Sequence, residues 1–182
     1  MSTDTFDPQA VVDFWVDAGP SRWFTKDADF DARFRTTFLA AHEAAAAGRL
    51  DDWAATPHGA LALLLLLDQF PRNSFRASPR MYATDAQARR VASAAVDAGL
   101  DRAVPEDLRL FFYLPFAHSE SLVDQARSVA LHETLPPPAV DHARRHRDIV
   151  ARFGRFPHRN RILGRTTTAE EQAFLDGGGF AG

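Results

Sequence analysis

Apolar residues recur at helical spacing along most of the chain, and no useful stretch alternates as a strand would. Between about Asp27 and Ala47, for example, Phe30, Phe34 and Phe38 follow one another at intervals of four. This spacing places the three rings on one face of a helix, directed toward a core. The pattern therefore predicts an all-α fold.

Helix start signals support this prediction. Asp7-Pro8 and Thr56-Pro57 each place a capping side chain before a proline at the first helical position. Thr168–Glu171 has the spacing of a capping box, with Glu171 at the third helical position. Each signal stands directly before or within the first turn of a predicted helix.

Helix stop signals then divide the chain into about eight helices. Pro71 is expected to end the third helix, and Pro115 to kink the fifth or begin a new segment, because proline has no N–H to donate. The predicted helices cover approximately residues 8–18, 27–47, 57–70, 84–98, 105–114, 119–133, 139–153 and a short segment after 168.

The connections between these helices are short, and none resembles a linker between domains. We therefore expect residues 1–182 to form a single compact domain, a helical array or bundle. Gly177, Gly178 and Gly179 follow the last helix, and residues 177–182 are expected to form a mobile tail.

Composition narrows the class of protein. The longest apolar run, Ala60–Leu67, has eight residues, whereas a bilayer span needs about 20, so no membrane partner is expected. Met1–Ala10 has no basic segment of a secretory signal, and the chain has no cysteine, which fits a cytoplasmic protein. A net charge of −3 argues against nucleic acid as a partner. Without a glycine-rich phosphate loop, no cofactor is predicted.

Three polar strings stand out from this apolar background. Ala60–Leu67 and Leu110–Phe116 are apolar nearly all round, so both should be central helices. The first is followed by Asp68–Asn73 and the second by His118–Gln125, while Arg152–Arg165 is rich in arginine. Charges beside a buried segment must be paired or face a wet cavity. We therefore expect these three polar strings to be neighbours in space.

The same segments carry a resemblance to a known family. LALLLLLDQFPRNSFR at 61–76, FFYLPFAHSESLVDQ at 111–125 and the stretch at 146–175 look like the bacterial family catalogued as domain of unknown function 924, as does the stretch at 23–38. The resemblance covers almost the whole chain. It implies an all-helical fold similar to tetratricopeptide-type arrays, and it brings neither an activity nor catalytic residues.

In the first polar string, Asp68, Arg72 and Asn73 are candidate ligand-binding residues. The planar guanidinium of Arg72 could hold a carboxylate or phosphate through two parallel hydrogen bonds. The structural alternative is that Asp68 pairs with an arginine of the third string while Asn73 caps a turn.

In the second polar string, His118 and Glu120 are the best candidates for a catalytic acid/base pair, because imidazole titrates near neutral pH and a carboxylate can be tuned toward it. Gln125 is a further candidate for ligand binding. Ser119 is not assigned as a nucleophile, since a catalytic triad is defined in space. It is expected to cap the sixth helix.

In the third polar string, Arg155, His158, Arg159 and Asn160 form the candidate anion-binding turn. Their side chains offer many donors, with no acid close in sequence. The alternative is that these donors satisfy helix carbonyls and the acids of the other two strings.

His142 and His146 are four residues apart, a spacing used by zinc sites. The neighbouring Arg144, Arg145 and Arg147 would repel a cation, so no metal site is predicted. His146 is expected to face the core, and the three arginines to form a solvated face.

Two hypotheses of different classes follow. In the first, the three polar strings line one pocket for an anionic small molecule, in a binding protein or an enzyme, with Arg72, Arg155 and Arg159 fixing the anion. In the second, the chain is a tetratricopeptide-like module for a protein partner, and the strings form a structural network of ion pairs. The sequence assigns no oligomeric state.

Overall fold

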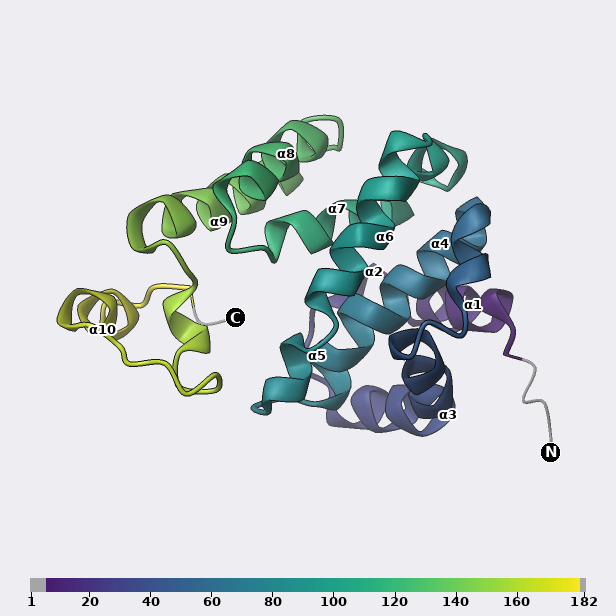
Figure 1. Cartoon of the computed structure of the whole chain (residues 1–182), viewed down its shortest axis with the longest axis horizontal. Helices are drawn as coiled ribbons and strands as arrows, with labels where there is room; N and C mark the ends of the chain where they lie inside the picture. The colour runs from purple at the N-terminus through teal and green to yellow at the C-terminus, as the bar shows by residue number, and fades with distance from the viewer. Residues whose placement is uncertain (1–5, 181–182) are drawn as a thin grey trace. The chain divides into compact units, whose positions relative to one another are not determined.

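The computed structural model describes residues 6–180, and these residues contain helices but no strand (Figure 1). The all-α prediction is therefore confirmed, while the tetratricopeptide-like arrangement stays a prediction. Contacts between Cα atoms divide the chain into two compact units, Met1–Arg76 with Arg80–Pro115, and Ala77–Pro79 with Phe116–Gly182. We describe each unit by itself, and the single-domain organisation stays a prediction.

Unit 1 contains most of the helices. They are α1 (Pro8–Ala18), α2 (Pro20–Trp23), α3 (Ala28–Ala46), η1 (Asp51–Ala55), α4 (Pro57–Leu64), η2 (Leu65–Gln69), α5 (Phe70–Ser74), α6 (Asp85–Asp97), η4 (Leu100–Ala103) and α7 (Glu106–Ala117), whose last two residues reach unit 2. The short η3 (Pro79–Tyr82) lies at the boundary. Within the unit, α4 packs against α1 and α6, and α3 packs against α5.

Unit 2 is built on α8 (Leu122–His132), which packs against α9 (Ala139–Phe153). A loop containing η5 (Pro157–Arg159) then leads to α10 (Ala169–Asp176), which packs on η5. The core between these elements centres on Phe156, which is fully buried against Ile149 and Val150.

The predicted start signals are confirmed. Asp7 accepts a hydrogen bond from the Gln9 amide, and Thr56 accepts one from the Gly59 amide. Thr168 and Glu171 form the complete capping box, each side chain accepting from the other residue's backbone N–H. These bonds satisfy amides at the helix start that have no partner within the helix.

The core of unit 1 is aromatic. Phe30 and Phe34 of α3 are buried, as predicted, and their rings pack around Trp15 of α1 at 6.0 and 5.5 Å between centroids. Phe70 meets Phe34 edge to face at 5.1 Å, and Phe111 of α7 meets Trp15 in the same way at 5.4 Å. The apolar stripe of α3 therefore joins helices that are distant in sequence.

The prediction that Pro71 ends the third helix is wrong. α4 widens into the π-helical turn η2, where the Phe70 amide donates to the Leu65 carbonyl five residues back, and α5 continues to Ser74. Proline has no N–H to offer the carbonyls four or five residues before it. A π-turn lets the helix continue past that missing donor.

The two carbonyls that Pro71 cannot serve have side-chain donors instead. The Leu66 carbonyl lies 2.9 Å from His42 Nδ1, which must donate because a carbonyl only accepts. The Thr84 hydroxyl donates to the Leu67 carbonyl. Both donors come from outside the helix, so local sequence rules could not reveal that it continues.

Two further boundaries differ from expectation. α7 runs through Pro115 to Ala117, so Pro115 begins no new segment. α8 begins at Leu122 rather than at Ser119. Ser119 accepts a hydrogen bond from the Ser121 amide and donates to Asp124 at 2.6 Å, so it organises the turn before the helix without being its capping residue.

Of the predicted mobile tail, residues 177–180 are described and 181–182 lie outside the described residues. The Gly179 amide donates to the Phe174 carbonyl, and the Phe180 ring lies 4.7 Å from that of His146. Across residues 6–180, no helix combines the length and apolar character required to cross a membrane.

Candidate functional site

The first polar string is held by carboxylates of unit 1. Asp68 is buried and forms an ion pair with Arg72 at 3.0 Å, one helical turn away. The Arg72 guanidinium also grips both oxygens of Asp85, at 2.8 and 3.0 Å. Burial alone would lower the pKa of Arg72, but Asp68 and Asp85 outweigh it and the pKa is raised. Arg72 is thus a charged link between η2 and α6.

Asn73 of the same string reaches a different helix. Its side-chain amide donates to Asp31 of α3 at 2.7 Å, and Arg76 pairs with the same carboxylate at 2.8 Å. Asn73 therefore joins α5 to α3. Asp68, Arg72 and Asn73 therefore all make contacts that join helices of unit 1.

The second and third polar strings meet inside unit 2, whereas the first lies in unit 1, so the expectation that all three are neighbours stays a prediction. Arg165 holds Glu120 with two parallel hydrogen bonds of 2.7 and 3.0 Å, and the Phe156 amide donates to the same carboxylate at 2.8 Å. Burial alone would raise the pKa of Glu120, but the bonds from Arg165 and Phe156 outweigh it and lower the pKa. At neutral pH Glu120 is thus an ion-paired carboxylate, which has no proton to donate and is a weaker base than a free glutamate.

Arg155 forms the second ion pair of unit 2. It grips both oxygens of Glu171 at 2.6 and 2.8 Å, and the Asn160 amide adds a bond of 3.1 Å. The hydrogen bond from Arg155, followed by the Thr168 and Asn160 donors, lowers the pKa of Glu171 to about 2 against the opposing effect of burial. Arg155 and Asn160 thus fasten the loop to α10.

Arg159 and Gln125 bind backbone carbonyls near the end of α7. Arg159 donates to the His118 carbonyl at 2.9 Å and lies over the Phe156 ring at 4.6 Å. The buried side-chain amide of Gln125 donates to the carbonyls of Ala117 and Ser119 at 2.8 and 2.6 Å. The Arg159 bond fits the structural alternative for the third string, in which its donors satisfy carbonyls at helix ends.

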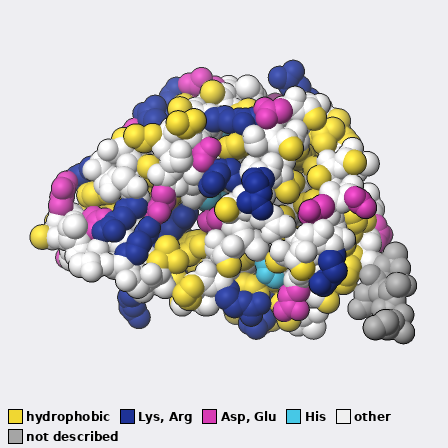
Figure 2. All heavy atoms as spheres, viewed as in Figure 1, with side chains coloured by type: hydrophobic (Ala, Val, Ile, Leu, Met, Phe, Trp, Pro, Cys, Tyr) yellow, Lys and Arg dark blue, Asp and Glu magenta, His cyan; other side chains and the backbone are white. Residues whose placement is uncertain are grey.

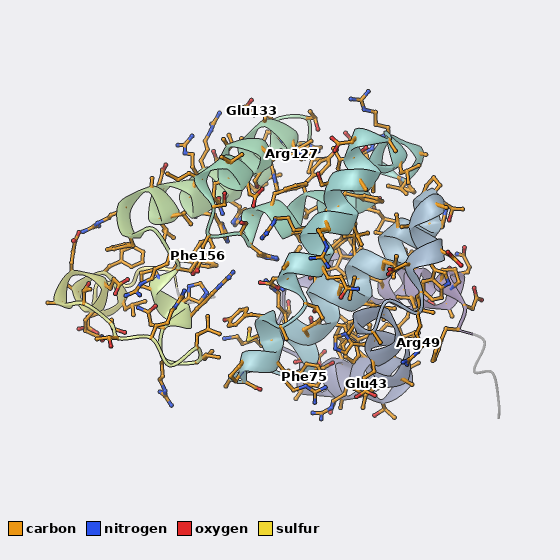
Figure 3. All side chains as sticks on the ribbon, viewed as in Figure 1. Glu43, Arg49, Phe75, Arg127, Glu133 and Phe156 are labelled. Carbon is orange, nitrogen blue, oxygen red and sulfur yellow. The ribbon has the colours of Figure 1, made fainter. Side chains whose placement is uncertain are left out.

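Figure 3 labels Phe156 beside the loop that follows α9, and two imidazole rings lie against its ring. The His146 and His158 rings lie 5.5 and 5.7 Å from the Phe156 ring, and both also contact Phe180. Burial, followed by the charge of Arg159, lowers the pKa of His158 to about 3. Burial likewise lowers the pKa of His146 to about 4. Both rings are therefore neutral at pH 7.

A pocket of about 330 Å³ opens beside these rings, within unit 2. We call it the α9 pocket, and its lining residues are His142, Arg145, His146, Gly178 and Phe180. No carboxylate is among them. No cluster of three metal-ligating side chains occurs among residues 6–180.

Arg145 lines the α9 pocket, although the sequence predicted for it only a place on a solvated helix face. Its neighbours on α9 each pair with a carboxylate: Arg144 with Glu133, Arg147 with Asp148, and Arg152 with Glu170. Arg145 alone of the four has no ion-pair partner among the residues that the structure describes. Figure 2 shows the same intermixing of basic and acidic side chains on one face of the molecule.

The one signal in the sequence that marks Arg145 is its spacing. His142, Arg145 and His146 stand at positions i, i+3 and i+4 of α9, which places them next to one another on the helix. The missing acid could not be foreseen, because Asp141 and Asp148 flank this segment in sequence and either could have been its partner.

Comparisons with known proteins agree with the fold and assign no chemistry. The profile of a family described as "Bacterial protein of unknown function (DUF924)" matches residues 11–179. A solved structure of a protein of unknown function from Agrobacterium tumefaciens is similar, with 54% identity and a TM-score of 0.92 over 93% of this chain and 97% of that one. No curated protein matches the chain.

Proposed function

This chain belongs to a bacterial family of unknown function, and from its own geometry we propose that unit 2 binds a small anionic ligand in the α9 pocket, with Arg145 as the anchoring cation. The observation that carries the proposal is the charge balance along α9. Three arginines of the helix are paired with acids, while the fourth lines a pocket without one.

The composition of the pocket fits an anion. A guanidinium offers five N–H donors in a fixed plane, suited to two oxygens of a phosphate or carboxylate. His142 and His146 add imidazole groups beside it, and Phe180 adds an aromatic wall. A volume of about 330 Å³ lies at the lower end of the range for small-molecule pockets, roughly 300–1,000 Å³.

The proposed anion site is at Arg145 rather than at Arg72, Arg155 and Arg159, which the sequence favoured. Arg72 and Arg155 already hold carboxylates with both arms of the guanidinium, so an anion would have to displace Asp85 or Glu171. Arg145 requires no such displacement. The ion pairs of the third polar string instead support the pocket, because Arg155 and Glu171 fasten α10, which leads directly to Gly178 and Phe180.

Titration calorimetry with inorganic phosphate, at constant ionic strength, tests this proposal. We expect saturable binding by the unaltered chain and at least a tenfold weaker affinity in Arg145→Gln. The matched control is Arg144→Gln, which removes the same charge from the adjacent position, where the side chain pairs with Glu133. The control should bind phosphate within about twofold of the unaltered chain.

Two results would overturn the proposal. One is the absence of saturable binding by phosphate and by a panel of other small anions, including carboxylates. The other is an equal loss of affinity in Arg145→Gln and Arg144→Gln, because that would show only the general attraction of a basic surface.

A further inference from the structure

Resting on the proposed anion site, we infer that the α9 pocket selects an oxyanion that carries its own proton, such as hydrogen phosphate, over a fully deprotonated one such as sulfate. The selecting group is His146, whose free ring nitrogen presents a lone pair rather than an N–H to the ligand.

The backbone of α9 fixes the tautomer of His146. Its Nδ1 lies 2.8 Å from the His142 carbonyl oxygen, one turn earlier in the helix. A carbonyl oxygen only accepts hydrogen bonds, so Nδ1 carries the proton. In a neutral ring Nε2 is then the acceptor, and no described residue donates to it.

The ring faces no negative charge that would favour a second proton. It lies between the rings of Phe156 and Phe180, at 5.5 and 4.7 Å. The ionisable groups that act on it are His142 of its own helix, His118, and Arg159 and His158 of η5, all of them neutral or cationic. Burial is the largest of these effects, and it lowers the pKa of His146 to about 4.

The free nitrogen of His146 belongs to a side chain that lines the α9 pocket. The two nitrogens occupy opposite parts of the imidazole ring, so Nε2 points away from the α9 backbone when Nδ1 is bonded to it. His146 lines the α9 pocket beside Arg145. The pocket therefore offers one set of strong donors, on Arg145, together with one acceptor, on His146.

Hydrogen phosphate complements this arrangement. At neutral pH it keeps at least one O–H, which can donate to Nε2 while its charged oxygens accept from Arg145. Sulfate has only acceptors, so its lone pairs would meet the lone pair of Nε2. Sulfate must therefore bind with a protonated His146, a form present at only about one part in a thousand at pH 7 when the pKa is about 4.

The test compares phosphate with sulfate by calorimetry at pH 7 and at pH 5, in two buffers with different heats of ionisation. We expect phosphate to bind at least tenfold more tightly at pH 7. The advantage should shrink at pH 5, where a bound sulfate stabilises protonated His146. Sulfate binding should take up a proton from the buffer, and phosphate binding should take up much less.

His146→Gln removes the fixed acceptor, because an amide can turn either its N–H or its oxygen toward the ligand. The phosphate-to-sulfate ratio should then fall toward one. A circular dichroism melt checks that this variant is folded. Should it fail to fold, the affinity ratio and proton uptake of the unaltered chain still decide the question.

The outcomes separate the two proposals. If sulfate binds as tightly as phosphate at pH 7 and both depend on Arg145, the anion site stands and the selectivity is wrong. A tenfold preference that His146→Gln leaves unchanged would also overturn the inference. If neither anion binds, nor any other small anion, both proposals fall.

Discussion

Glu170 and Glu171 are adjacent in sequence yet have different roles. Glu170 is mostly exposed and pairs with Arg152, itself mostly exposed. Glu171 is buried and accepts from Arg155, Asn160 and the Thr168 amide. At the scale of the residue, burial and the number of donors determine what a charge contributes, because an exposed pair is screened by water while a buried one is not.

This contrast gives a stability prediction. Glu171→Gln should lower the free energy of unfolding by about 2 kcal/mol or more, since Arg155 would lose its partner while partly buried. Glu170→Gln, the matched control, should cost less than about 1 kcal/mol. Urea unfolding of both variants measures the difference. Equal costs would show that the Arg155–Glu171 pair is not a stabilising feature of the fold.

The pH dependence of stability follows from the same residue. The pKa of Glu171 is lowered from 4.5 to about 2 in the folded chain. A carboxylate with a depressed pKa stabilises the fold above its unfolded value, and this stability is lost as the pH falls from 4.5 toward 2. Urea unfolding across this range should therefore show a shallower decline in Glu171→Gln than in the unaltered chain. Parallel curves would contradict the assignment.

Among the helices, the sequence correctly predicted the boundaries and caps that depend on residues close in sequence. The capping box at Thr168 and the helix from Ala139 to Phe153 are as expected, because each depends on side chains within a few positions. The passage of the helix through Pro71 was missed because it depends on donors from α3 and the start of α6. His42 and Thr84 lie 24 and 17 residues away from the carbonyls they bind.

The π-turn can be tested through Thr84. Thr84→Val keeps the shape of the side chain and removes the donor to the Leu67 carbonyl, and this hydroxyl makes no capping bond in α6. A buried carbonyl left without a partner should lower the free energy of unfolding by about 1–3 kcal/mol. Thr36→Val, which removes an exposed hydroxyl bond within α3, should change it by less than about 0.5 kcal/mol. A similar cost for both would refute the role given to Thr84.

At the scale of the whole molecule, the sequence singled out the three polar strings, but it did not predict most of the side chains with which they pair. The pair Asp68–Arg72 is one turn long and could be proposed from spacing alone. Glu120 and Arg165 are 45 residues apart, and Arg155 and Glu171 are 16 apart. Their pairing depends on how α8, α9 and α10 fold back on one another, which no local rule specifies.

The same reasoning explains why Arg145 was overlooked. An arginine is conspicuous in a sequence when it stands alone, whereas Arg145 lies among arginines and beside acids. It becomes distinctive only when every neighbouring charge has been assigned a partner in space. The candidate function of this chain therefore rests on an arginine without an ion-pair partner among the described residues, rather than on a recognisable sequence motif.

The most direct test of the anion site is an NMR titration of the chain with inorganic phosphate, observing the Arg145 Nε–H and the His146 ring. The proposed anion site predicts saturable shifts at residues 142–146 and 178–180, absent in Arg145→Gln and retained in Arg144→Gln. Shifts that rise linearly without saturating, or that persist unchanged in Arg145→Gln, would contradict it.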